Sequence, residues 1–202
     1  TLLWWFKEYL DKVGYDKACL IMHTDPKDEN GQDLSCMIRD LGLESKKSVL
    51  ISQAKLPPEN LAMLYNAVDC TINISDAEGL GLSTFESLAC ETPIIAIMTG
   101  GLQEQLSPNI KVSAEDVSTR EIDPNKVEIY DNGIGIKPSS SAIIGSQQVP
   151  YIREDRMAKE DFFKALKIFC AMPKEQRKLL GQNGRKHIME NYNFDQFISK
   201  WD

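Results

Sequence analysis

Two glutamates and two glycines near the middle of the chain have the types and spacing to bind a phosphorylated carbohydrate. Glu78, Gly79 and Gly81 lie in a short loop, and Glu86 follows within the next predicted helix. Carboxylates accept hydrogen bonds from sugar hydroxyls, while glycine lets the backbone approach a ligand closely. The unpaired N–H groups and the positive dipole end of a helix starting at Ser83 favour a phosphate. Together these groups indicate a diphosphate with a sugar beside it.

The same residues have ordinary structural interpretations, which the pattern leaves open. Ser83 and Glu86 match a capping box, in which the serine caps the helix and the glutamate reaches back to it. Glu78 could be a solvated loop residue, and short glycine patterns recur in many turns.

The elements around this segment place the loop at the end of a buried strand. We expect a strand over Cys70–Ser75, a loop over Asp76–Leu82, a helix over Ser83–Cys90 and a strand over Pro93–Met98. Short apolar strands that alternate with helices are typical of a mostly parallel sheet covered on both faces. Such folds bind ligands beyond the carboxyl ends of their strands.

The preceding part of the chain continues the alternation. We expect Gly14 to end the first helix in the left-handed conformation. The elements predicted before the central segment are a helix over Thr1–Val13, a strand over Lys17–Thr24, a helix over Leu34–Leu41, a strand over Ser48–Gln53 and a helix opened by Pro57 and Pro58.

The pattern weakens after Gly101. The span Pro108–Asp155 is irregular, although Asn109–Ser113 could form a strand and Lys126–Lys137 has a hairpin signal around Asp131, Asn132 and Gly133. Helical periodicity returns at the end of the chain, where the predicted helices are Lys159–Met172, Pro173–Asn191 and Phe194–Trp201.

Composition favours a single domain of a water-soluble protein. The 202 residues are 42% hydrophobic, enough for a sizeable core, and a net charge of -7 opposes binding to nucleic acid. No apolar run is long enough for a membrane helix and no signal peptide opens the chain, so we expect no integral membrane segment and a cytoplasmic location. The five scattered cysteines suit reduced, buried thiols and no metal site.

The central segment resembles the signature of glycosyltransferase family 4, whose members are retaining enzymes of the two-domain GT-B fold. The resemblance covers about Leu61 to Glu104. It comprises the Glu-x7-Glu spacing and the loop glycines, together with Leu64-Tyr65, Asp69, Thr92-Pro93 and Gly100-Gly-Leu-Gln-Glu104. This resemblance implies a Rossmann-like, doubly wound α/β domain with C-terminal helices, the C-terminal half of a GT-B enzyme, with residues 1–202 as a single nucleotide-sugar-binding domain.

The resemblance also implies a role for each matching residue. Glu86 would hold the ribose hydroxyls, and Glu78, the catalytic residue, would contact the transferred sugar near its reacting carbon. Ser52 and Gln53, at the end of the second strand, would line the base pocket. The diphosphate and donor sugar would face the segment made of Gly79, Leu80, Gly81, Leu82, Ser83 and Thr84.

The implied reaction is transfer of a hexose-like sugar from a nucleoside diphosphate sugar to an acceptor hydroxyl, with retention and with no cofactor or obligatory metal. The acceptor would be a glycan, a lipid or a small molecule. The alternative is a non-catalytic module that binds or senses a sugar nucleotide. A dinucleotide oxidoreductase would need a glycine fingerprint after its first strand, which is absent.

The chain departs from the family pattern in four ways. The family's basic pair near the first strand of this domain is missing, and so is the N-terminal acceptor domain, so we expect this chain alone to be inactive. Glu91 stands where the family usually has glycine at a helix end, and a left-handed residue there costs about 1 kcal/mol. The irregular span 108–155 is longer than usual.

Overall fold

The computed structural model describes residues 1–29, 31–44, 48–106, 126–145 and 147–199. The chain forms two compact units, Thr1–Pro57 and Pro58–Asp202, and each is described by itself. No helix among the described residues is both long and apolar enough to cross a membrane.

The first unit contains two helices and two parallel strands: α1 (Leu2–Val13), β1 (Leu20–His23), α2 (Leu34–Asp40) and β2 (Val49–Ser52). β1 and β2 pair in parallel with His23 opposite Ser52. α1 forms because its apolar residues recur at helical spacing and bury one face, made of Leu3, Phe6, Tyr9 and Leu10. Gly14 has a positive φ of 108°, but its ψ of 144° lies outside the left-handed helical region, so that detail of the prediction is wrong.

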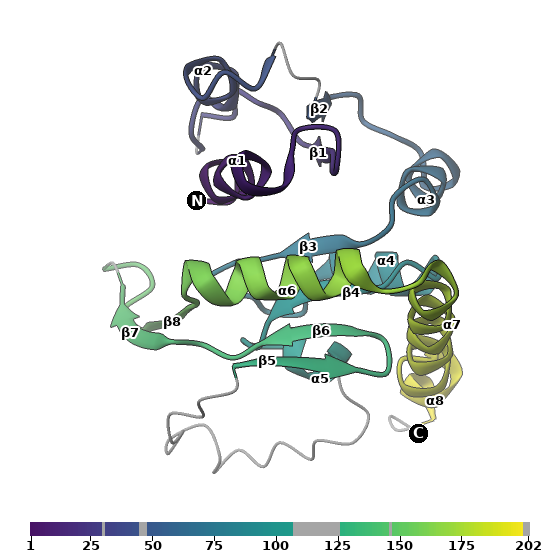
Figure 1. Ribbon diagram of the computed structural model, residues 1–202. Helices are drawn as coiled ribbons and strands as arrows, with labels where there is room; N and C mark the ends of the chain where they lie inside the picture. The colour runs from purple at the N-terminus through teal and green to yellow at the C-terminus, as the bar shows by residue number, and fades with distance from the viewer. Residues whose placement is uncertain (30, 45–47, 107–125, 146, 200–202) are drawn as a thin grey trace. The chain divides into compact units, whose positions relative to one another are not determined.

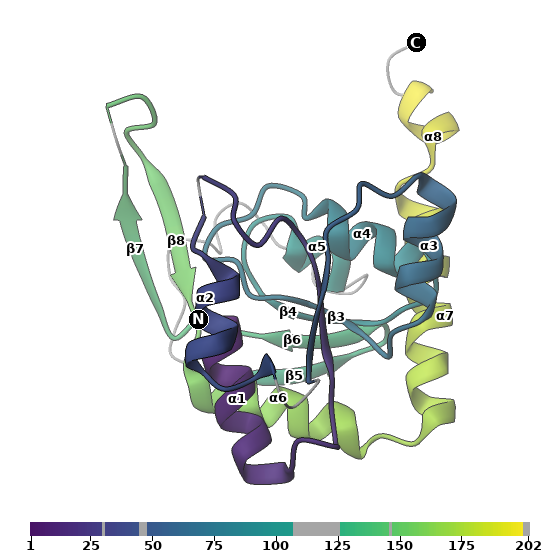
Figure 2. The ribbon, with the colours of Figure 1, turned by 90° about the horizontal axis from the view of Figure 1, so that it is seen from above.

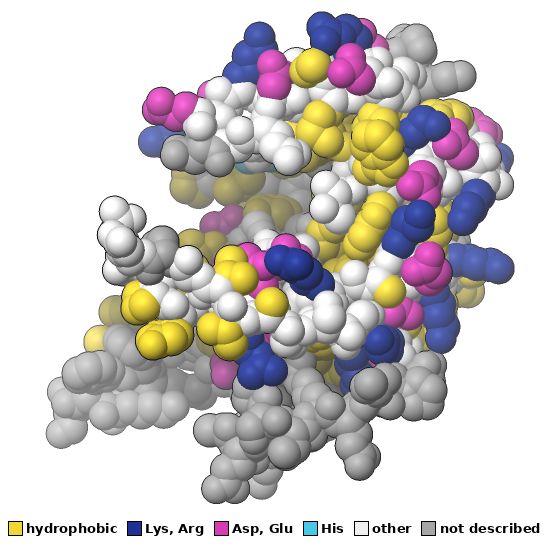
Figure 3. Space-filling model, turned by 90° about the vertical axis from the view of Figure 1, so that its left-hand side faces the viewer, with side chains coloured by type: hydrophobic (Ala, Val, Ile, Leu, Met, Phe, Trp, Pro, Cys, Tyr) yellow, Lys and Arg dark blue, Asp and Glu magenta, His cyan; other side chains and the backbone are white. Residues whose placement is uncertain are grey.

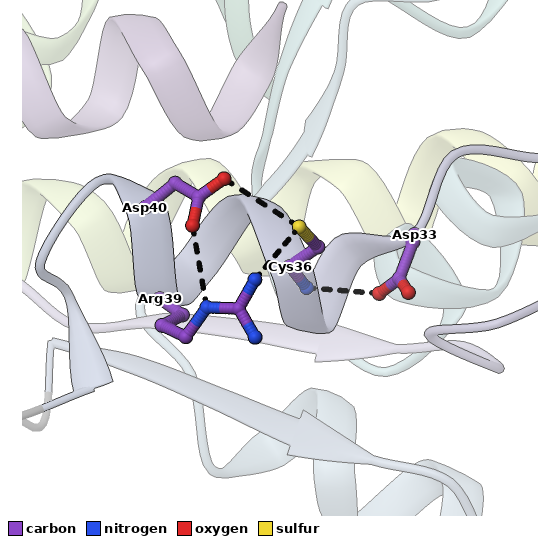
Figure 4. A network of polar contacts seen from close by, with 4 residues as sticks. All are labelled: Asp33, Cys36, Arg39 and Asp40. Carbon is purple, nitrogen blue, oxygen red and sulfur yellow. Dashed lines mark hydrogen bonds and ion pairs between the residues drawn. The ribbon is translucent and has the colours of Figure 1, made fainter.

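Polar contacts run along the surface of α2, and one of them caps its first turn (Figure 4). The side chain of Asp33 caps the helix by accepting a hydrogen bond from the backbone N–H of Cys36 at 2.8 Å. Arg39 donates to the Cys36 sulfur at 3.1 Å and lies 3.3 Å from an oxygen of Asp40. All five cysteines are free thiols, but the expectation that they are buried is wrong, since Cys19 and Cys170 are exposed.

The second unit is built on a four-stranded sheet with the order β3-β4-β6-β5 (Figure 1). β3 (Thr71–Asn73), β4 (Ile94–Ile97) and β6 (Gly133–Ile136) are parallel, whereas β5 (Val127–Tyr130) is an antiparallel edge strand. Every residue of β4 is fully buried, as expected for an inner strand covered on both faces.

Helices cover both faces of this sheet, as Figures 1 and 2 show. α4 (Leu82–Ala89) and α5 (Leu102–Leu106) lie on one face, and α6 (Lys159–Ala171) lies on the other. α7 (Lys174–Asn191) packs against α4. The remaining helices of this unit are α3 (Pro58–Asn66) and α8 (Phe194–Ile198). The Rossmann-like α/β fold predicted from the sequence is confirmed.

The predicted hairpin in the irregular span is confirmed, and a second hairpin was not predicted. Asp131 and Asn132 connect β5 to β6 as a two-residue turn. The second hairpin consists of β7 (Ser140–Ile144) and β8 (Ile152–Arg156). The possible strand Asn109–Ser113 lies outside the described residues.

The β7–β8 hairpin projects from the rest of its unit (Figure 2). Figure 3 faces the side on which this hairpin lies, where hydrophobic side chains are visible at the surface. The exposed apolar residues of the hairpin are Ile143, Ile144, Val149 and Tyr151. A two-stranded sheet is marginally stable by itself, so the attachment of the hairpin to its unit determines where it points.

α4 ends in a Schellman motif whose left-handed residue is Glu91. The backbone N–H of Thr92 donates to the carbonyl of Ser87 at 2.9 Å, and the N–H of Glu91 donates to that of Leu88 at 3.0 Å. Glu91 has a φ of 61° and is the one non-glycine residue with positive φ among those described. The expected left-handed helix end at Glu91 is therefore confirmed.

Replacing Glu91 with glycine is expected to stabilise the protein by about 1 kcal/mol, because glycine adopts a left-handed conformation without a Cβ clash. For a domain of this size the melting temperature would rise by about 2–4 °C in a thermal denaturation experiment. Glu91→Ala is the matched control: it removes the exposed ion pair with Arg185, at 3.9 Å, and keeps the Cβ. A gain as large for alanine as for glycine would contradict the explanation.

Candidate functional site

The loop that carries Glu78 begins at the carboxyl end of β3, where a parallel sheet places its ligands. Asn73, the last residue of β3, is buried, and its side chain forms hydrogen bonds with two residues of the following loop. Its amide oxygen accepts the N–H of Ser75 at 3.0 Å, and its amide nitrogen lies 3.4 Å from a carboxylate oxygen of Glu78. Glu78 is consequently half-buried and hydrogen-bonded, and the alternative of a freely solvated loop residue is wrong.

Gly100 and Gly101, which follow β4, contact the backbone of the loop that carries Glu78. The N–H of Gly101 donates to the carbonyl of Gly79 at 2.8 Å. A Cβ on Gly100, whose φ is 48°, would lie 1.8 Å from the carbonyl oxygen of Glu78. Because only glycine allows this approach, the turn after β4 and the Glu78 loop are in direct backbone contact.

Buried hydrogen bonds turn the carbonyls of the loop toward the protein. The side-chain amide of Gln105, which is fully buried, donates to the carbonyls of Leu80 and Gly81. In a trans peptide the N–H points opposite to the carbonyl. The N–H groups of Gly81 and Leu82 therefore point away from Gln105, and that of Leu80 points away from Gly101. Successive N–H groups with a common direction form a concave site for an anion.

α4 begins at the end of this loop without a side-chain cap. Its N-cap residue is Gly81, in the left-handed conformation with φ 81°. The first N–H groups of a helix have no partner within the helix, so the start of α4 presents donors and a positive dipole end. Ser83 is exposed, whereas Thr84 is buried and donates its hydroxyl to the carbonyl of Gly81 at 2.8 Å.

The capping-box interpretation of Ser83 and Glu86 is wrong. Because the helix starts at Leu82, Glu86 is its fifth residue and lies beyond the position from which a glutamate reaches back to the cap. Its carboxylate instead accepts the hydroxyl of Tyr65 at 2.9 Å. Burial of the Tyr65 ring and this hydrogen bond both raise the pKa of the phenol, so Tyr65 remains a donor to Glu86 at neutral pH. Glu86 is exposed, so its carboxylate has room for further donors.

Most of the predicted site residues lie in the loop after β3 and the first five residues of α4, between Glu78 and Glu86. Ser52 and Gln53 belong to the other unit, at the carboxyl end of β2. The Ser52 hydroxyl lies 3.0 Å from Nδ1 of His23, and the Gln53 amide donates to Asp25 at 3.2 Å. Their part in a base pocket stays a prediction.

Two supporting residues, Asn73 and Gln105, were missed in the sequence. Asn73 is a polar residue inside a short apolar strand, a placement that indicates a buried amide with assigned partners. Gln105 gave no such signal. The sequence LQEQL mixes apolar and polar residues as an ordinary short amphipathic helix does, and nothing in it marks Gln105 as buried.

Comparison with known proteins decides the family. The sequence profile described as "Glycosyl transferases group 1" matches residues 15–121, which is more than half of the chain. The chain belongs to this glycosyltransferase family. The matched range contains both glutamates, the loop glycines and the Gly100–Gly101 pair.

Curated relatives of this group 1 glycosyltransferase chain carry the name D-inositol 3-phosphate glycosyltransferase. The protein from Corynebacterium jeikeium is 45% identical over 98 residues, which are 47% of this chain and 23% of that protein. The protein from Acidothermus cellulolyticus is 38% identical over 69 residues, 34% of this chain and 15% of that protein. The chain thus matches less than a quarter of the length of these relatives.

Solved glycosyltransferase structures share the fold at low sequence identity. Sucrose-phosphate synthase from Thermosynechococcus elongatus aligns with 96% of this chain and 40% of its own, with a TM-score of 0.61 and 19% identity. The C-terminal domain of a glycosyl transferase group 1 family protein, LpcC from Francisella tularensis, aligns with 94% of this chain and 78% of its own, with a TM-score of 0.57 and 18% identity. At these identities the likeness supports the fold of the group 1 chain and nothing finer.

Proposed function

We propose that this chain is the donor-binding half of a retaining family 4 glycosyltransferase, which transfers a hexose-like sugar from a nucleoside diphosphate sugar to an acceptor hydroxyl. The observation that carries the proposal is the segment from Glu78 to Glu86, in which inward-bonded carbonyls turn backbone N–H groups outward between two carboxylates. An anionic pair beside an anion site suits a ligand that offers both hydroxyls and phosphate.

The roles of the residues follow from their chemistry in this arrangement. The N–H groups of the segment from Gly79 to Thr84 would face the diphosphate, which also meets the positive end of α4. Glu86, fixed by Tyr65, would accept the ribose hydroxyls, and Glu78, fixed by Asn73, would lie beside the transferred sugar. Ser52 and Gln53 would contact the base. The proposal retains the cytoplasmic location and an acceptor held by an N-terminal domain.

Donor binding tests this function directly. We expect isothermal titration calorimetry of the chain with UDP-glucose, GDP-mannose and ADP-glucose to detect binding of at least one donor. Glu86→Gln should weaken that binding about 10- to 100-fold, because hydrogen bonds to a charged acceptor contribute about 1.5–3 kcal/mol. Glu190→Gln, an exposed carboxylate on α7, is the matched control and should leave the affinity unchanged. Absence of binding by all three donors would refute the proposal.

Turnover separates an enzyme from a sugar-nucleotide sensor. In a full-length protein that contains this chain, transfer or donor hydrolysis supports the enzyme, whereas tight donor binding without turnover supports the non-catalytic module. D-inositol 3-phosphate is the first acceptor to assay, because it appears in the names of the relatives.

Removal of divalent metal is expected to leave the activity unchanged, since the proposed mechanism uses backbone N–H groups to stabilise the leaving diphosphate. Transfer by the full-length protein would be measured before and after dialysis against EDTA. A loss of more than about tenfold that Mg²⁺ restores, equivalent to about 1.4 kcal/mol in the barrier, would contradict the metal-independent mechanism.

A further inference from the structure

One buried carboxylate lies outside the segment that the sequence pattern identified. Asp155, in β8, is 5% exposed and is the one Asp or Glu among the described residues that is buried. A charged group removed from water is stable only where hydrogen bonds or opposite charge replace its solvation. The contacts of Asp155 are therefore a necessary part of the structure around it.

These contacts join three segments of the second unit. The backbone N–H of Asp155 donates to the carbonyl of Asp76 at 2.7 Å. One carboxylate oxygen accepts the hydroxyl of Thr99 at 3.0 Å, and the other accepts that of Ser141 in β7. The guanidinium of Arg153 lies 3.6 Å from the second oxygen. The β7–β8 hairpin is thus attached at once to the loop after β3 and to the turn after β4.

Both attachment points adjoin the backbone that shapes the Glu78 loop. Asp76 begins that loop, two residues before Glu78. Thr99 precedes Gly100 and Gly101, whose backbone lies against the carbonyls of Glu78 and Gly79. Asp155 therefore fixes the distance between the two chain segments that determine where the Glu78 carboxylate lies.

We propose that Asp155 is a positioning residue for Glu78. The proposal rests on the function proposed above and adds a residue from the β7–β8 hairpin to the same site. Asp155 acts through backbone and hydroxyl contacts and not on the substrate. Its loss should affect the reacting end of the site more than the nucleotide, because Glu86 and Tyr65 lie on α4 and α3, away from these contacts.

The kinetic test compares two substitutions in the full-length protein. Asp155→Ala removes the acceptor for Thr99 and should lower kcat about 10- to 100-fold, as small misplacements of a catalytic group do, while the donor KM changes less than about fivefold. Asp155→Asn should restore most of the activity, because its amide oxygen can accept the Thr99 hydroxyl and its amide nitrogen can donate to Ser141. Val127→Ala, a buried truncation in β5, controls for lost stability and should keep kcat near wild type. Equal kcat for the alanine variant and wild type would overturn the proposal.

Hydrogen exchange of the chain in the absence of donor tests the positioning role of Asp155 independently of the proposed function. Asp155→Ala should speed exchange of the Gly101 amide, which donates to the Gly79 carbonyl, at least tenfold relative to Asp155→Asn, with α7 amides unchanged. If Asp155→Ala does not fold, Thr99→Val removes the same hydrogen bond and should give the same local effect. Unchanged exchange at Gly101, or equal acceleration in α7, would overturn the positioning role. Absent donor binding by the wild type would instead refute the proposed function alone.

Discussion

Glu78→Gln is expected to lower kcat for sugar transfer by about 10²- to 10³-fold, the range measured when one preorganised electrostatic group is removed from an active site. Glutamine keeps the size of the side chain and can still meet Asn73, whose amide lies 3.4 Å from the Glu78 carboxylate. The substitution therefore removes charge with little change of shape. Steady-state kinetics of the full-length protein would measure the loss.

The donor dissociation constant distinguishes this effect from lost binding. Glu78→Gln should leave it within about threefold, less than the 1.4 kcal/mol that corresponds to a tenfold change. Glu86→Gln should do the reverse, with weaker donor binding and a smaller change in kcat. If the two variants weaken binding equally and leave kcat unchanged, the division of roles between the two glutamates is wrong.

Gly100→Ala is expected to destabilise the second unit by about 2–4 kcal/mol, the sum of a left-handed backbone and a steric clash. The added Cβ would lie 1.8 Å from the Glu78 carbonyl oxygen, and no side-chain rotation can relieve a clash with backbone. Donor binding should also be weakened, because the clash forces apart the turn after β4 and the Glu78 loop that it contacts. Chemical denaturation and calorimetry would measure the two effects.

Two other glycines separate the causes. Gly42 has a φ of 67° and open space around its Cβ position, so Gly42→Ala should show the backbone cost alone, about 1 kcal/mol. Gly79 has neither a positive φ nor a neighbour within 4 Å, so Gly79→Ala should leave stability nearly unchanged. Similar destabilisation in all three variants would show that the contact between Gly100 and Glu78 is not the cause.

Local sequence signals were sufficient to predict the parallel strands, the flanking helices and the loop between β3 and α4. A short apolar run such as Ile94–Ile97 indicates a buried strand, and glycines just before a helix indicate a tight loop. The left-handed Glu91 was expected from the family resemblance, because it stands where that family usually has glycine at a helix end.

The parts that depend on distant contacts could not be predicted. Whether Glu86 caps its helix or meets another residue is decided by Tyr65, which is 21 positions earlier in the chain. The β7–β8 hairpin gave no clear strand pattern, and its attachment comes from Asp155 and Thr99, which are 56 positions apart. Sequence patterns report periodicity within one element and not which elements become neighbours.

The fully buried Gln105 has a consequence for how quickly a ligand can be captured. Because the Gln105 amide already binds the carbonyls of Leu80 and Gly81, the outward direction of the Gly81 and Leu82 N–H groups is set before any ligand arrives. Association would then proceed as rigid-body docking, with little entropy lost to ordering the protein. Free pyrophosphate should compete with the whole donor as a simple inhibitor, and its on-rate should depend on salt and hardly at all on conformational exchange.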